Sequence, residues 1–143
     1  MVDMVNELLV KLNYKDFPRI CVLNADKTFT RDLKKALKGK QVDKMIDPRF
    51  LYDFIIIFTY NVSDIEELVP DSIHNLSEDG ILWVAYPKKS SPNFVSDISR
   101  DTGWGTLKTL GYKGVRQISI NDDLSALRFR NAKFVKRRKD RQK

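Results

Sequence analysis

The segment Tyr52-Asp53-Phe54-Ile55-Ile56-Ile57-Phe58-Thr59-Tyr60 decides the fold of this chain, because it is apolar at almost every position. A strand with one face in solvent would alternate apolar and polar residues. A continuous apolar run is instead typical of a parallel strand that helices cover on both faces. We therefore expect this segment to be the central strand of an α/β sheet.

The segments before this strand show helix and strand patterns in turn. Asp26 or Thr28 can cap a helix, and Gly39 can end it. In chain order we expect a helix at residues 2–13, a strand at 19–24, this capped helix, and a short strand at 41–46. The chain thus begins with a strand–turn–helix unit.

The segments after the central strand continue the alternation. Ser63 and Glu66 form a capping box that starts a helix, and Asp79-Gly80 turns into a strand. The further elements that we expect are this strand at 81–86, a helix from Ser96 or Asp97 to Leu110, and a hairpin of strands at 115–120 and 124–129. The hairpin would add one antiparallel strand to a mainly parallel sheet.

Alternating strands and helices predict an α/β fold, a three-layer, Rossmann-like, mainly parallel sheet with a C-terminal antiparallel hairpin. The chain has 143 residues, the size of one domain. We expect one Rossmann-like domain at residues 1–130 and a flexible basic C-terminal tail at 131–143.

The basic character of the chain belongs to its C-terminal end. From Arg128 onward there are nine basic residues and one acid, which leaves 17 basic and 18 acidic residues for positions 1–127. Such a tail can contact phosphates without regard to sequence, or it can be a solvated terminus. Its expected partner is nucleic acid or an acidic protein, through Lys133, Lys136, Arg137, Arg138, Lys139, Arg141 and Lys143.

Composition excludes several classes of protein. The longest apolar stretch is far too short to cross a bilayer, so no membrane partner is expected. Cys21 is the only cysteine and His74 the only histidine, which excludes an intramolecular disulfide and a multi-histidine metal site. We expect no metal, a cytoplasmic location, and core positions for Cys21, Trp83 and Trp104.

Two places can hold a ligand. In an open α/β sheet the crevice lies beyond the carboxyl ends of the strands where the strand order reverses, here between the strands at 19–24 and 52–60. The side chains expected at this crevice are Asn24, Asp26, Thr59, Tyr60 and Asn61. A second, anion-binding site would combine a helix N-terminus near Asp97 with Lys88, Lys89, Ser90, Ser91 and Arg100.

Residues 50–130 resemble the second half of a class I methyltransferase fold. The resemblance rests on Leu76-Ser77-Glu78-Asp79-Gly80-Ile81-Leu82-Trp83-Val84 and on Leu107-Lys108-Thr109-Leu110-Gly111-Tyr112. It implies a reduced version of that fold. The segments Trp83-Val84-Ala85-Tyr86-Pro87-Lys88, Asp97-Ile98-Ser99-Arg100-Asp101 and Ser125-Ala126-Leu127-Arg128-Phe129-Arg130 are similar to a bacterial family known only as a domain of unknown function.

The turn after the first strand argues against methyltransferase activity. S-adenosylmethionine binding in that fold uses a glycine-rich turn, whereas residues 24–29 contain no glycine. Asp43 and Asp47 are available as ribose-binding acids, but neither is clearly placed. We therefore expect no cofactor, no binding of S-adenosylmethionine, and a non-catalytic binding module with a polyanion-binding tail. The alternative is an enzyme that acts on a small anionic substrate through Lys88, Ser90 and Arg100, and we rank a methyltransferase last.

Overall fold

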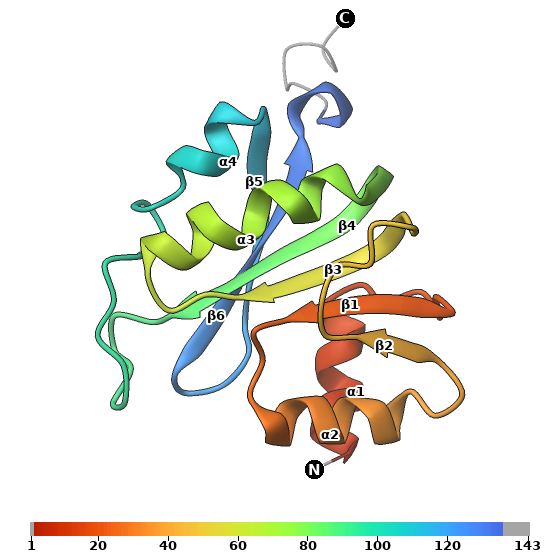
Figure 1. The fold of residues 1–143 in the computed structure, drawn as a ribbon. Coiled ribbons are helices and arrows are strands. Elements are labelled where there is room, and N and C mark those ends of the chain that lie inside the picture. Colours follow the sequence, from red (N-terminus) through yellow and green to blue (C-terminus); the bar gives the residue numbers. More distant parts are fainter. Residues whose placement is uncertain (1, 136–143) are drawn as a thin grey trace, which may run out of the picture.

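The computed structural model describes residues 2–135, with side chains from residue 5 onward. Six strands form one sheet in the order β2-β1-β3-β4-β6-β5 (Figure 1). Their bounds are β1 Arg19–Leu23, β2 Gln41–Asp43, β3 Tyr52–Phe58, β4 Leu76–Pro87, β5 Tyr112–Ser119 and β6 Leu124–Asn131. β6 runs antiparallel to both of its neighbours, and the β2-β1-β3-β4 pairings are parallel. The expected mainly parallel sheet with an antiparallel hairpin is confirmed.

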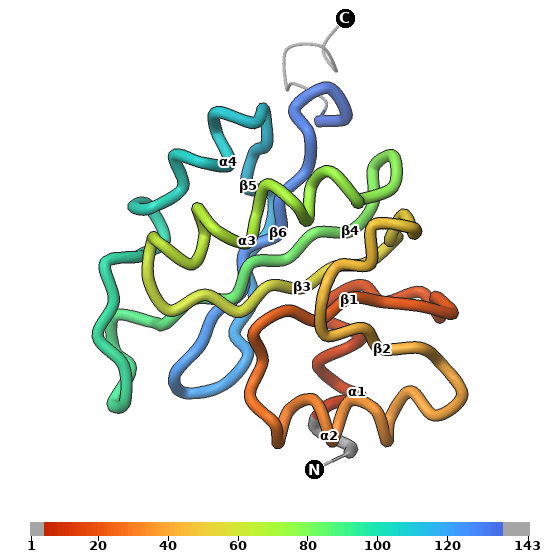
Figure 2. Tube along the Cα trace, in the orientation of Figure 1, coloured from red at the N-terminus to blue at the C-terminus, as the bar shows by residue number. Residues whose placement is uncertain are grey.

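Helices cover both faces of the sheet, which gives three layers (Figure 1). Helices α1 (Val2–Lys11) and α2 (Lys27–Ala36) pack on one face, and α3 (Val62–His74) and α4 (Gly105–Thr109) on the other. Figure 2 shows that the first half of the chain builds the β2-β1-β3 side of the sheet, and the second half builds the β4-β6-β5 side. None of the helices within residues 2–135 has the length and apolar character needed to span a membrane.

Strand β3 lies between β1 and β4, and its side chains enter both layers of the core. Phe54, Ile56 and Phe58 belong to the cluster under α1 and α2. Ile55 and Ile57 belong to the cluster under α3, and none of the five is more than 3% exposed. Burial on both faces explains why the sequence of this strand does not alternate.

Helix α3 begins at a different residue from the one that the capping box predicts. The N-cap is Asn61, whose side-chain oxygen accepts a hydrogen bond from the backbone N–H of Asp64 at 2.9 Å. The Ser63 hydroxyl instead donates to the same Asn61 oxygen at 2.6 Å. β4 also begins earlier than expected, at Leu76, which pairs with Tyr52; the register then shifts before Ile81 pairs with Phe54.

The predicted helix from Ser96 or Asp97 to Leu110 is wrong over its first half, since α4 has only five residues. The Asp97 carboxylate accepts a hydrogen bond from the backbone N–H of Val62, at the start of α3, at 2.8 Å. Gly103 has a φ of +103°, which no right-handed helix can contain. A tertiary contact and a left-handed residue therefore replace the expected helical turns.

Candidate functional site

The carboxyl ends of β1 and β3 meet at a turn that begins with Asn24. Asn24 has a φ of +61°, in the left-handed region that glycine adopts freely and asparagine tolerates better than most residues. Its side-chain amide donates to the Phe58 carbonyl at 2.9 Å. Asp26 then caps α2 by accepting from the backbone N–H of Phe29 at 2.7 Å. The turn thus joins the ends of two neighbouring strands.

The three residues after β3 also hold the fold together at this edge. Thr59 is fully buried, and its hydroxyl donates to the Ala85 carbonyl at 2.8 Å. Tyr60 is half-buried; burial raises the pKa of its phenol, which therefore stays neutral. Asn61 is the α3 N-cap. The structure places all five expected crevice residues at these strand ends, where each makes a hydrogen bond within the chain.

A cavity of about 310 Å³ opens beside the turn, between the segment after β2 and helix α3. We call it the β1 cavity. Its lining combines two carboxylates and a lysine with apolar side chains: Leu23, Asn24, Lys44, Met45, Ile46, Glu67, Leu68 and Asp71. Of the five expected crevice residues only Asn24 lines it. The spacing of Glu67 and Asp71, one helical turn apart, was the signal in the sequence that could have found its acidic wall.

The two acids considered for a ribose, Asp43 and Asp47, are engaged elsewhere. Asp43 pairs with Arg19 at 2.7 Å and accepts a hydrogen bond from the Tyr52 hydroxyl at 2.5 Å. Asp47 pairs with Arg49 at 2.7 Å, and the hydrogen bonds from Arg49 lower the pKa of Asp47 to about 2. Neither carboxylate lines the β1 cavity. An acid that contacts a ribose there would come from α3.

Some of the side chains predicted to form an anion site after β4 lie together, and the binding of an anion there stays a prediction. Lys88, Lys89 and Arg100 line one groove of about 300 Å³, which we call the Lys88 groove. Tyr86, Ser99, Asp101, Gln117 and Ser125 complete its lining. The Lys88 ammonium donates to the Ser119 hydroxyl at 2.7 Å. Three cations therefore converge beyond the carboxyl end of β4, as the sequence predicted.

Other parts of that prediction are wrong. Ser90 and Ser91 do not line the Lys88 groove, and the Ser91 hydroxyl donates to the Asp123 carboxylate at 2.6 Å. The helix N-terminus expected near Asp97 does not exist, because α4 begins at Gly105. An anion in this groove would therefore meet side-chain cations and hydroxyls, but it would not lie at a helix N-terminus.

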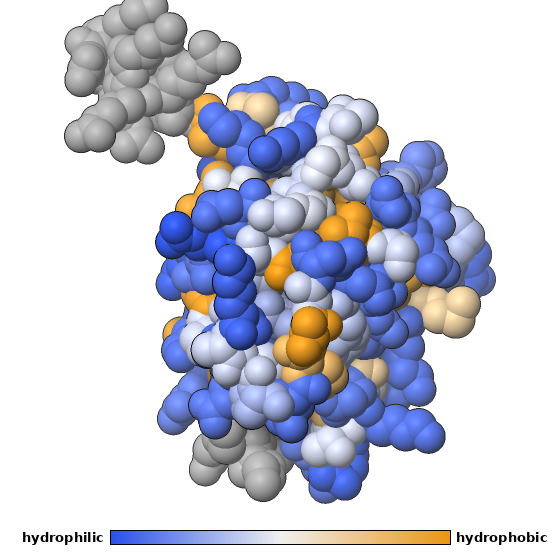
Figure 3. All heavy atoms as spheres, turned by 90° about the vertical axis from the view of Figure 1, so that its left-hand side faces the viewer, coloured by the Kyte–Doolittle hydropathy of each residue, from blue (hydrophilic) through white to orange (hydrophobic). Residues whose placement is uncertain are grey.

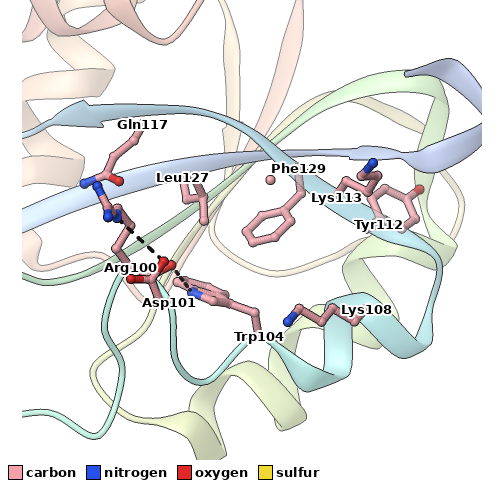
Figure 4. A pocket seen from close by; sticks show the side chains of 10 residues that line it. Arg100, Asp101, Trp104, Lys108, Tyr112, Lys113, Gln117, Leu127 and Phe129 are labelled. Atoms are coloured by element: carbon pink, nitrogen blue, oxygen red, sulfur yellow. Dashed lines mark hydrogen bonds and ion pairs between the residues drawn. The ribbon is translucent and has the colours of Figure 1, made fainter. Parts of the chain in front are cut away.

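A larger groove, of about 510 Å³, continues from the Lys88 groove between α4 and β5 (Figure 4). Arg100, Asp101 and Gln117 line both, and in Figure 4 Leu127 and Phe129 point toward Trp104. We call it the Trp104 groove. Its polar rim includes Lys108, which the sequence did not single out. Figure 3 views the side where the strands end, and hydrophobic residues there form small patches among hydrophilic ones.

The expected core residues lie in the core. Trp83 is fully buried, and its indole N–H donates to the Leu12 carbonyl at 2.8 Å. Trp104 is 5% exposed, and its indole N–H lies within 3.0 Å of the carbonyls of Ser99 and Arg100. Burial raises the pKa of the Cys21 thiol to about 12, so it is a core residue and no nucleophile.

No family model matches the chain, and no curated protein matches it either. The similarity to an uncharacterised bacterial family therefore stays a prediction.

Solved structures of S-adenosylmethionine-dependent methyltransferases share the fold. N-methyltransferase NodS from Bradyrhizobium japonicum WM9, in complex with S-adenosyl-L-homocysteine, has a TM-score of 0.52 at 12% identity, over 90% of this chain and 85% of that chain. A methyltransferase from Clostridium acetobutylicum ATCC 824 has a TM-score of 0.57 at 7% identity, over 90% and 89%. The glycopeptide N-methyltransferase MtfA with sinefungin has a TM-score of 0.55 at 8% identity, over 90% and 92%.

At these identities the likeness establishes the fold, a reduced class I methyltransferase fold. It also corrects our interpretation of the chain as a non-catalytic module with methyltransferase activity ranked last, since the neighbours are methyltransferases and two are complexed with S-adenosyl-L-homocysteine or sinefungin. The argument had rested on the missing glycine after β1. Asn24 supplies the positive φ of this turn without a glycine, although its side chain stays beside the cavity, where a glycine would allow closer backbone approach.

Proposed function

We propose that the chain is an S-adenosylmethionine-dependent methyltransferase and that the methyl donor binds in the β1 cavity. The observation that carries this proposal is the position of the cavity. It lies at the carboxyl end of β1, where the strand order reverses and where ligands bind in open α/β sheets. In a chain with this fold, that position supports a donor site.

The lining of the β1 cavity fits the chemistry of the donor. Glu67 and Asp71 can accept hydrogen bonds from ribose hydroxyls or from the donor's ammonium group. Leu23, Ile46 and Leu68 offer apolar contacts for an adenine ring. Its volume of about 310 Å³ is at the lower end of the range of ligand pockets. When bound, S-adenosylmethionine supplies an electrophilic methyl group on a sulfonium ion.

The Lys88 groove is the second part of the proposal, as the site of the methyl acceptor. β1 and β4 are separated by one strand, so their carboxyl ends lie about 10 Å apart at the usual spacing of neighbouring strands. Lys88, Lys89 and Arg100 favour an acceptor with a carboxylate or phosphate. Asp101 is the carboxylate in the lining of this groove, and it pairs with Arg100 at 3.7 Å.

Isothermal titration calorimetry with S-adenosyl-L-homocysteine tests the donor site. We expect saturable binding to the full chain. Glu67→Gln should weaken it about tenfold, as the loss of one charge-assisted hydrogen bond does. Glu66→Gln is the matched control, because Glu66 is exposed on the same helix and does not line the cavity. Absence of binding at millimolar ligand, or an equal effect of both substitutions, would contradict the proposal.

A further inference from the structure

The face of the β5–β6 hairpin that points away from α4 carries only basic charge. Phe129 and Leu127 point toward α4, so the residues that alternate with them on β6, Arg128 and Arg130, lie on the opposite face. The ladder places Arg116 opposite Arg128 and Lys113 opposite Arg130, and Lys113 also lines the Trp104 groove at the edge of this face. We call these four residues the cationic face.

Two like-charged pairs directly across a ladder disfavour the folded hairpin. Opposed side chains in antiparallel strands lie about 5 Å apart, and like charges at that distance repel. Neither β5 nor β6 contains an acidic residue that would separate these cations. A surface that keeps such pairs is suited to an anion that binds between them.

The arginines of this face are only partly neutralised within the described chain. Arg130 makes a two-pronged pair with the Asp79 carboxylate, at 3.0 and 2.7 Å. The Arg128 Nε is buried and has no hydrogen-bond partner within residues 2–135. Burial first, and then the nearby charge of Arg130, lower the pKa of Arg128. Arg116 is exposed. An added phosphate can therefore reach Arg116 directly, whereas the buried Arg128 Nε would have to become accessible before it could donate to a phosphate.

The shape of the surface favours a polymer over a small anion. Arg116, Arg128 and Arg130 line none of the cavities and grooves described above. Arg128 and Arg130 are two residues apart on a strand, or about 7 Å, which places two guanidinium groups in a row along β6. Exposed Lys133 follows directly after β6.

We infer that the cationic face binds the phosphate backbone of nucleic acid. The inference goes beyond the proposed methyl transfer and does not depend on it. The basic residues 136–143, which the sequence analysis assigned to the same partner, lie outside the described part of the chain.

Fluorescence anisotropy tests this surface, with the full chain, a labelled 20-base-pair duplex of arbitrary sequence, and no methyl donor. Arg116→Gln/Arg128→Gln should lower the affinity at least tenfold near 0.1 M salt and reduce the log–log salt slope by about 1.8, because two phosphate contacts are lost. The control Lys34→Gln/Lys35→Gln removes the same charge from exposed positions on α2 and should leave both values unchanged.

A charge-conserving variant separates binding from folding. Arg116→Lys/Arg128→Lys should keep the salt slope of the native chain, and thermal melts should show that each variant is folded. Equal affinities for the native chain and the glutamine variant would overturn the inference, as would displacement of the duplex by an equal charge concentration of polyglutamate. Because no donor is present, failure here leaves the methyltransferase proposal unaffected.

Discussion

Asn24 combines two roles at one position, a left-handed backbone and a hydrogen bond to the Phe58 carbonyl. Asn24→Ala would lose the bond and put at a positive φ a residue that tolerates this conformation less well than asparagine does. We predict a loss of about 1–2 kcal/mol in the free energy of unfolding, measured by urea denaturation. Asn24→Gly should cost less, since glycine accepts the positive φ. An alanine variant as stable as the native chain would contradict this account of the turn.

Asp43 makes folding stability depend on pH. Burial opposes its ionisation, but hydrogen bonds from Tyr52, Gln41 and Arg19 outweigh burial and lower the pKa of Asp43. A lowered pKa means that the stabilisation is present above the unfolded value of about 3.9 and is lost as the pH falls through the folded value. We predict that Asp43→Asn lowers the melting temperature at neutral pH and flattens its decrease below about pH 4.

The control for Asp43 is Asp122→Asn, in the exposed turn of the β5–β6 hairpin. It should leave both the neutral melting temperature and its acid dependence close to those of the native chain. If Asp43→Asn gave the same acid dependence as the native chain, other carboxylates would have to account for it.

At the scale of elements, the sequence pattern and the structure give different N-caps for α3. Asn61 accepts the capping hydrogen bond from Asp64, whereas Ser63 only donates to Asn61. We predict that Asn61→Ala lowers the free energy of unfolding by about 1 kcal/mol and that Ser63→Ala lowers it by a few tenths. Chemical denaturation of both variants measures this. If Ser63→Ala lowered the free energy of unfolding more than Asn61→Ala does, the capping box of Ser63 and Glu66 would be the cap.

The strands were predictable because burial leaves a direct mark on their sequence. β3 is apolar throughout, since helices cover it on both sides. The helix predicted from Asp97 failed for a non-local reason. Aspartate is a common helix cap, which is why the sequence predicted a helix here. The Asp97 carboxylate instead accepts a hydrogen bond from the backbone N–H of Val62, 35 residues away, and no local pattern contains that contact.

The candidate site was predictable to the same extent. The strand ends could be located, so Asn24 and Lys88 were expected at the carboxyl edge of the sheet, where the structure has them. Arg100 reaches the same groove from a loop where the sequence predicted a helix. The spacing of Glu67 and Asp71 could have indicated the acidic wall of the β1 cavity. The opposite wall could not be predicted, because no local pattern shows how the segment after β2 lies against α3.

Over the whole molecule, the proposed small-molecule sites and the proposed polymer site lie apart. The β1 cavity and the Lys88 groove lie at the carboxyl ends of the strands, whereas the cationic face lies on the hairpin surface opposite α4. A polymer on the cationic face would leave the strand ends open. Binding of nucleic acid and binding of S-adenosyl-L-homocysteine should therefore be measurable independently.

The C-terminal segment 136–143 should add to the electrostatic binding without adding to the core. It contains six basic residues, one acid and no apolar residue, so its removal takes away charge and no hydrophobic burial. We predict an unchanged melting temperature for the chain truncated after Val135, together with weaker binding to duplex DNA and a log–log salt slope smaller by as much as about 5.

Two further variants separate the contribution of the tail from that of the cationic face. A full-length variant with Lys136, Arg137 and Arg138 changed to Gln should lie between the native and truncated chains, with a slope smaller by at most about 2.7. The truncated chain should keep the binding that the cationic face supplies. Arg116→Gln/Arg128→Gln in the truncated chain should weaken this remaining binding further. If truncation leaves the affinity unchanged, the tail is a solvated terminus, and phosphate binding rests on the hairpin alone.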